Sequence, residues 1–276
     1  MPEAIGAVAL LLALALYLAA VRRVRTRSPW PRHRTALWVG GSLCVGIAWV
    51  GPLPAAAHTD FTVHMAGHLL LGMVGPLLLV LAAPVTLALR ALSTRRARGL
   101  ARVLRSPLPR VVTHPVVAAT LNAGGLWVLY ATDLYAAMHQ SVLVHTLVHL
   151  HVFLAGVAFT VSVIGPDPNP HRAGLRTRVV VLVCFIAAHS VLGRWLYGHP
   201  PAGVDPDAAR AGAQLMFYGG EAVDLVFLVL LFRGWYPQAR RGGGPAARTP
   251  SGRPGEEIQP RGEPFGIPAR RYTGHY

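Results

Sequence analysis

Charged side chains are scarce in this sequence. Only 13% of its 276 residues are charged and 53% are hydrophobic, whereas a soluble domain carries a charge at about 25% of its positions. This shortage of charge excludes an ordinary soluble globular domain. The composition instead predicts a protein that is embedded in a lipid bilayer.

Cysteine and the common ligand-binding motifs are also scarce or absent. Cys44 and Cys184 lie in apolar segments and form no CxxC motif, which argues against a disulfide framework and a thiol-based metal shuttle. The sequence has no GxxxxGK[ST] phosphate loop, no GxGxxG after a strand pattern and no HExxH zinc motif. No nucleophile is paired with a base, so we expect no enzymatic activity, a buried metal hydrolase being the catalytic alternative.

Long apolar segments are abundant instead. A helix needs about 20 residues to cross a hydrocarbon core about 30 Å thick, and seven segments approach or reach that length. They are residues 4–21, 35–51, 63–89, 114–131, 141–164, 178–197 and 212–232. We therefore expect an all-α fold, a polytopic membrane protein with a bundle of seven transmembrane helices over residues 1–236.

The basic residues are all arginine, and they are unevenly distributed. If the seven segments span the membrane, 24 of the 26 arginines fall on one side of it. Basic residues favour the cytoplasmic side of spanning helices, so this distribution predicts an amino terminus outside and a carboxyl terminus in the cytoplasm. The net charge of +15 is thereby explained by topology, and no nucleic-acid partner is expected.

Proline marks two kinds of interruption. Pro76 and Pro84 in the third segment each remove a backbone hydrogen bond and are expected to kink the helix or end it near the inner face. Residues 237–276 are rich in Pro, Gly and Arg and poor in apolar side chains. We expect them to form a disordered cytoplasmic tail.

Histidine pairs stand inside two of the apolar segments. Ionisable groups within a membrane are costly and are functional candidates by default. His64 and His68 in "HMAGH", and His145 and His149 in "HTLVH", are each four residues apart, which places each pair on one face of a helix. The predicted topology brings both pairs to the same depth near the outer surface, with His189 of the sixth segment close to them.

The last segment adds carboxylates. Glu221 is expected at a depth similar to that of His189, so five imidazoles and one carboxylate can meet in the outer half of the bundle. Asp224 lies on nearly the same stripe of that helix. Arg194 is a candidate partner for both carboxylates, so a structural ion pair is the alternative to metal binding.

The chemistry of this set leaves several possibilities. Imidazoles and carboxylates without a thiolate pair suit copper or zinc, with iron possible. Haem held between two imidazoles, a proton path, and plain interhelical hydrogen bonds are the alternatives. His151 is expected to point away from the set. His58, His139 and His199 are expected to be solvated at the outer surface, with collection of a metal ion as the alternative.

Two longer stretches resemble a known family. "HMAGHLLLGMVGPLLLVLAAP" and the region from "HPVVAATLNAGG" through "HQSVLVHTLVHLH" to "GPDPNP" resemble the CtaG-like cytochrome c oxidase assembly factors of bacterial plasma membranes, over about residues 30–235. The resemblance implies a seven-helix protein that helps to mature a haem-copper terminal oxidase by supplying copper. By motif position, His64, His68, His145 and His149 would carry this role.

The histidines and the resemblance together predict a copper-binding assembly factor. It would receive Cu(I) from a donor on the extracytoplasmic side, bind it in the outer half of the bundle and present it to an oxidase subunit. His145 and His149 are the first candidate ligands, His64 and His68 the next, and His189 the third. A copper transporter or copper-resistance membrane protein is the alternative. A haem-binding electron-transfer protein is the second alternative.

Overall fold

The computed structural model describes residues 2–242, and within that range the chain is helical, without strands. Five helical segments are long and apolar enough to cross a membrane. They are α1 (Pro2–Arg25), the broken segment Phe61–Ala91, α12 (Val142–Val163), α13 (Leu175–Gly198) and α14 (Pro206–Gly242). The all-helical membrane fold predicted from the sequence is confirmed at this level.

Two further segments account for the difference from the seven predicted spans. The first, Pro115–Ala131 with α11 (Leu134–Gln140), is bent by 77° and forms a sixth span if it counts as one. The second is α2 (Arg32–Trp49), which packs between α1 and α5. Because α2 begins with Arg-His-Arg, its 18 residues are less apolar than the others. The count of seven and the sides of the two termini therefore stay predictions.

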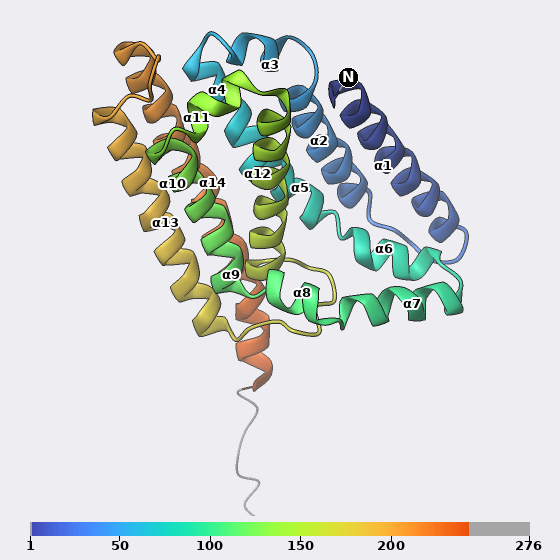
Figure 1. Ribbon diagram of the computed structural model, residues 1–276. Helices are drawn as coiled ribbons and strands as arrows, with labels where there is room; N and C mark the ends of the chain where they lie inside the picture. Colours follow the sequence, from blue (N-terminus) through green and yellow to red (C-terminus); the bar gives the residue numbers. More distant parts are fainter. Residues whose placement is uncertain (1, 243–276) are drawn as a thin grey trace, which may run out of the picture.

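The segment Phe61–Ala91 is broken at both prolines, as predicted. It consists of α4 (Phe61–Leu69), the π-helical turn η1 (Leu70–Val74), α5 (Gly75–Leu81) and α6 (Pro84–Ala91). The π turn absorbs the break before Pro76, because one extra residue lets the backbone N–H of Gly75 reach the carbonyl of Leu70. Ala83 has a left-handed backbone (φ 54°), and α6 leaves in a new direction (Figure 1).

The "GPDPNP" loop after α12 fixes the start of α6. The Asp167 carboxylate accepts hydrogen bonds from the backbone N–H groups of Val85 and Thr86, at 3.0 and 2.7 Å. These are donors that a helix start leaves without a partner. In the same loop Arg172 donates to the carbonyl of Gly165. Burial lowers the pKa of Arg172, and the nearby carboxylate of Asp167 offsets part of that effect.

Glycines allow η1 and α12 to touch. A Cβ atom on Gly156 would overlap the carbonyl of Gly72. That carbonyl has lost its usual helical donor, because residue 76 is a proline. Close backbone contact at small residues is a common mode of helix packing in membranes, and here it fixes the register between the two helices that carry the histidine pairs.

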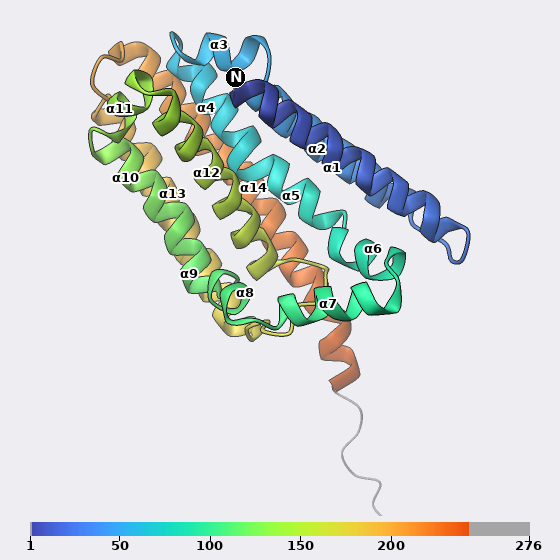
Figure 2. The same ribbon diagram turned by 45° about the vertical axis from the view of Figure 1, so that its right-hand side comes forward.

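The two ends of the bundle differ in composition. Short helices close each end: α3 (Pro52–Ala57) and α11 lie at one, and α6, α7 (Thr94–Leu104) and α8 (Pro107–Val112) at the other (Figures 1 and 2). The remaining turns of the sixth span are α9 (Pro115–Ala119), η2 (Thr120–Gly124) and α10 (Gly125–Ala131). We call the first end the histidine end and the second the arginine end.

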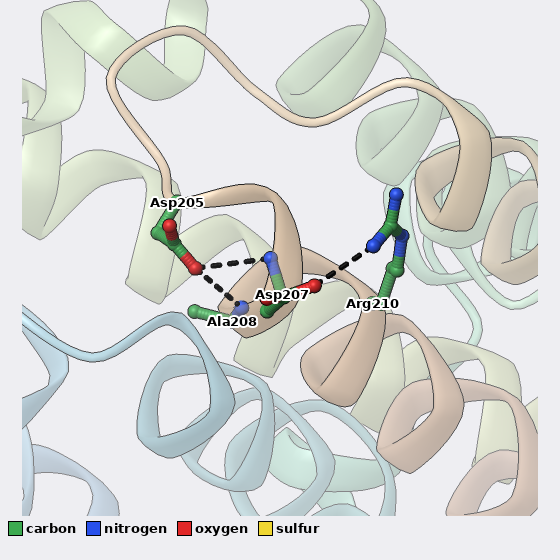
Figure 3. Close-up of polar contacts among 4 residues, drawn as sticks. All are labelled: Asp205, Asp207, Ala208 and Arg210. Carbon is green, nitrogen blue, oxygen red and sulfur yellow. Dashed lines mark hydrogen bonds and ion pairs between the residues drawn. The ribbon is translucent and has the colours of Figure 1, made fainter.

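Helix α14 starts at the histidine end with a polar cap. The Asp205 carboxylate accepts hydrogen bonds from the N–H groups of Asp207 and Ala208, at 3.0 and 3.1 Å (Figure 3). Asp207 also pairs with Arg210 at 2.8 Å, the one ion pair among the side chains described over residues 4–234. The helix continues to Gly242, past the boundary predicted at residue 236. Residues 243–276 of the predicted tail lie outside the described residues.

Candidate metal centre

Helix α4 carries the first histidine pair into the interior. The Asp60 carboxylate accepts hydrogen bonds from the N–H groups of Thr62 and Val63, at 2.7 and 3.2 Å, so the helix begins at Phe61. His64 and His68 then lie one turn apart on the inward face, each only 7% exposed. The prediction that this pair shares one helix face is confirmed.

The second pair lies beside the first. The rings of His64 and His149 are 6.4 Å apart, and a cavity of about 20 Å³ is lined by three imidazoles, those of His64, His68 and His149. Its other walls are Tyr130 and apolar side chains from η1, α10, α11 and α12. This volume suits a group of about the size of one water molecule. The structure therefore brings His64, His68 and His149 to one small space, which we call the inner cavity.

Hydrogen bonds leave ring nitrogens available in the inner cavity. His149 Nδ1 lies 3.0 Å from the carbonyl of His145. A carbonyl only accepts, so Nδ1 is the donor and Nε2 keeps its lone pair. His68 Nε2 is buried without a partner in the described part of the chain. Such groups usually have partners, so this unpaired imidazole nitrogen beside a cavity is a candidate ligand atom.

Tyr130 orients the third imidazole. Its hydroxyl lies 3.2 Å from His64 Nε2 and 3.7 Å from the Met65 sulfur. The hydroxyl has one proton, so it either accepts from His64 Nε2–H and leaves the lone pair on Nδ1, or donates to Nε2 and leaves the proton on Nδ1. A hydrogen-bond partner on the far ring nitrogen is the usual arrangement for histidines that bind metal ions.

A larger pocket lies on the outer side of His149. It has a volume of about 190 Å³, and its walls include four imidazoles, those of His58, His139, His145 and His149. The rings of His145 and His149 stack at 4.1 Å, and that of His58 lies 5.1 Å from His145. His149 is the histidine that lines both this outer pocket and the inner cavity.

His58 and His139 are exposed, as expected, and they also form a wall of the outer pocket, with their rings 5.8 Å apart. Sequence reasoning did not group them with the two histidine pairs. A signal for them exists in the sequence. Each stands six residues before a histidine pair, so the pattern H-x5-H-x3-H occurs twice. The short helices α3 and α11 fold those two histidines back over the pairs.

His189 extends the line of imidazoles inward. Its ring lies 6.5 Å from that of His68, it is 1% exposed, and its Nε2 has no partner within residues 2–242. It packs against Gly220 of α14, where a Cβ atom would overlap the ring. The rings thus run from the outer pocket through His64 and His68 to His189.

The carboxylates do not join this line. The Glu221 side chain is exposed on α14, whereas Asp224 is 2% exposed and neither of its oxygens has a partner in the described chain. The pairing of Arg194 with these carboxylates is wrong. Arg194 is exposed and its guanidinium lies 5.0 Å from the ring of Phe217, because the helix faces that bring His189 to Gly220 turn Arg194 outward.

His151 points away from the imidazoles, as expected. Its Nε2 lies 3.0 Å from the carbonyl of Leu121 in η2, where the π turn disturbs the helical hydrogen bonds. Within residues 2–242 no three His, Cys, Asp or Glu side chains stand in the geometry of a bound metal ion. The imidazoles share cavities instead, so binding an ion between them requires rotation of their rings.

Comparison with known proteins identifies the family. The model of the cytochrome c oxidase caa3 assembly factor family matches residues 15–238. Uncharacterized proteins of Mycobacterium bovis and Mycobacterium tuberculosis are each 32% identical over 197 residues, a match that covers 68% of this chain and 30% of each relative. No solved structure matches the chain. The family match covers most of the sequence, and this protein belongs to the cytochrome c oxidase caa3 assembly factor family.

Proposed function

We propose that this protein serves oxidase assembly in a bacterial plasma membrane by holding copper, as Cu(I), in the inner cavity and presenting it to an oxidase subunit. The observation that carries the proposal is the inner cavity itself, where the imidazoles of His64, His68 and His149 meet. Imidazole is a good copper ligand. The Nε2 atom of His68 is buried and has no hydrogen-bond partner among the described residues, so it can serve as a copper ligand.

The outer pocket serves as the entrance in this proposal. His58, His139 and His145 receive the ion from a donor on the extracytoplasmic side, and His149 passes it inward because it lines both spaces. His139 Nδ1 donates to the carbonyl of Tyr135 at 2.9 Å, so its Nε2 is the nitrogen that is free to bind.

The apolar half of the bundle favours presentation over transport. Beyond His189 the helices pack through a cluster that contains Phe159, Phe185 and Phe227. The nearby hydroxyls of Thr160 and Ser162 are used by carbonyls of their own helix, at 2.7 Å each. A copper transporter needs polar groups across this region, and of the buried side chains there Asp224 is the ionisable one.

Haem fits this arrangement poorly. Sites for organic ligands have volumes of about 300 to 1,000 Å³, and the inner cavity measures about 20 Å³. His64 and His149 would have to separate to admit a macrocycle between them. The size of the cavity supports a single ion over a porphyrin.

A copper titration tests the proposal. We expect the detergent-solubilised protein, titrated with Cu(I) without oxygen against a chromogenic chelator, to bind about one ion per chain. The His68→Ala/His149→Ala variant should lose more than about a hundredfold in affinity, since even an outer hydrogen-bond partner of a ligand contributes tenfold to a hundredfold. The control is His199→Ala, because His199 is bonded to the Trp195 carbonyl at 3.0 Å and lines neither histidine cavity.

Two cellular assays separate assembly from transport. In a bacterium that lacks this protein, the wild type should restore copper in the oxidase and the double variant should not. Equal copper binding by the double variant and the wild type would refute the proposed site. Copper accumulation by vesicles that contain this protein and no oxidase would favour the transporter.

A further inference from the structure

An apolar groove lies at the arginine end, away from the histidines. Its volume is about 300 Å³, and it runs between α2, α5 and α6 on one side and α8 and α12 on the other. Side chains of α12 on one helix face form much of its wall, namely Leu154, Val157 and Val161. Leu154 is 53% exposed. The groove is therefore accessible at the surface of a segment that we expect to lie in the membrane.

Helix α7 borders this groove and is strongly amphipathic. Its apolar positions recur at helical spacing, as do its arginines on the other face. The apolar residues are Ala97, Leu100, Ala101 and Leu104, and three of the four arginines, Arg95, Arg98 and Arg102, lie on the other face. No residue of α7 is buried, and Leu104 lines the groove. A helix of this kind lies in the interface between water and lipid.

Two arginines follow residues of the groove wall directly. Arg105 comes after Leu104, and Arg110 comes after Pro109, which also lines the groove. Both arginines are exposed, and neither forms an ion pair with the side chains described over residues 4–234. The Asp167 carboxylate lines the groove and accepts hydrogen bonds from the backbone of α6. The segments that border the groove therefore carry two unpaired arginines beside this one carboxylate.

We propose that this groove holds one acyl chain of an anionic phospholipid, and that Arg105 and Arg110 bind its phosphate. An acyl chain matches the apolar walls, and a guanidinium is well suited to a phosphate. Two exposed apolar side chains of α8, Leu108 at 71% and Val111 at 54%, are available to the same lipid. An apolar partner helix would use the walls of the groove but would gain nothing from the two arginines. A zwitterionic lipid would gain less from the arginines than an anionic lipid.

Native mass spectrometry of the full chain tests this site. The protein is released from detergent that contains phosphatidylglycerol or phosphatidylcholine, and the lipids retained per chain are counted. We expect one retained phosphatidylglycerol. Each arginine near an anionic surface contributes roughly a fivefold gain in binding, so Arg105→Gln/Arg110→Gln should lower retention by about tenfold or more.

Two further variants separate the charges from the groove. Leu154→Trp fills the groove from an exposed position and should also displace the lipid. Arg25→Gln/Arg27→Gln removes two exposed arginines at the carboxyl end of α1, at the same end of the bundle, and should leave retention unchanged. Equal retention of both lipids, an unaffected Leu154→Trp variant, or an equal loss in the Arg25/Arg27 control would overturn the proposal. The result is independent of whether the protein binds copper.

Discussion

Two regions of this protein share one histidine pattern and differ in their surroundings. His58, His64 and His68 have the same spacing as His139, His145 and His149. The pair on α4 is buried, whereas both histidines of the pair on α12 line the outer pocket. Helix α4 packs against α2, α3 and α14, while the start of α12 exposes Val142 and Leu143 at 67% and 68%.

The difference separates what spacing determines from what packing determines. A spacing of four residues places two imidazoles on one helix face in both regions. The neighbouring helices then decide whether that face meets protein or an open pocket. Because α12 lies at the rim and α4 lies inside, His149 becomes the side chain that connects the two environments.

The largest effect is expected where the two regions are held in register. Gly156→Val would drive a side chain into the carbonyl of Gly72, and overpacking of this kind costs about 1 to 3 kcal/mol. We expect a melting temperature lower by several degrees and loss of copper binding, because both histidine pairs shift. Gly174→Ala is the control, since nothing lies within 4 Å of a Cβ atom there. Unchanged stability of Gly156→Val would show that the contact is dispensable.

Two variants of α12 test whether His145 and His149 have different roles. His149→Ala should reduce Cu(I) affinity by more than about a hundredfold. His145→Ala should reduce it by about tenfold or less, because His145 lines the outer pocket but not the inner cavity. His145→Ala should instead slow the loading of copper, measured by stopped-flow competition. His151→Ala is the control from the same helix, and equal losses for His145→Ala and His149→Ala would remove the distinction between the two spaces.

A smaller effect is expected at Tyr130. Tyr130→Phe keeps the ring and removes the hydroxyl that lies 3.2 Å from His64 Nε2. We expect about tenfold weaker Cu(I) binding and a loss of about 1 kcal/mol in the free energy of unfolding. Tyr135→Phe is the matched control, because Tyr135 meets His64 through its ring, at 5.3 Å. Unaltered copper affinity in Tyr130→Phe would mean that His64 needs no orientation.

Much of the fold was predictable because apolar length and proline act locally. The histidine pairs, the break at Pro84 and the family resemblance all follow from adjacent residues. The bend between α10 and α11 and the π turns depend on packing between distant segments, such as Gly72 with Gly156. The predicted fourth span, residues 114–131, matches Pro115–Ala131, but nothing in the sequence indicated the bend to Leu134–Gln140 that follows it.

The sequence predicted which side chains of the candidate site share a helix face. It did not predict how each helix is rotated relative to its neighbours. His64, His68, His149 and His189 meet as predicted from depth and spacing. Depth alone also placed Glu221 among them, but its side chain is exposed. Gly220, the residue before it, is the one that faces His189, and one residue corresponds to about 100° around a helix.

The smallest effect is expected at Glu221, and it tests this rotation directly. An exposed side chain on α14 contributes nothing to a site behind Gly220, so Glu221→Gln should leave Cu(I) affinity within about twofold of the wild type. Asp224→Asn is the matched variant, because Asp224 is buried and its oxygens lack partners within residues 2–242. A tenfold loss in Glu221→Gln alone would mean that α14 turns when copper binds, because only such a turn brings this carboxylate to the imidazoles.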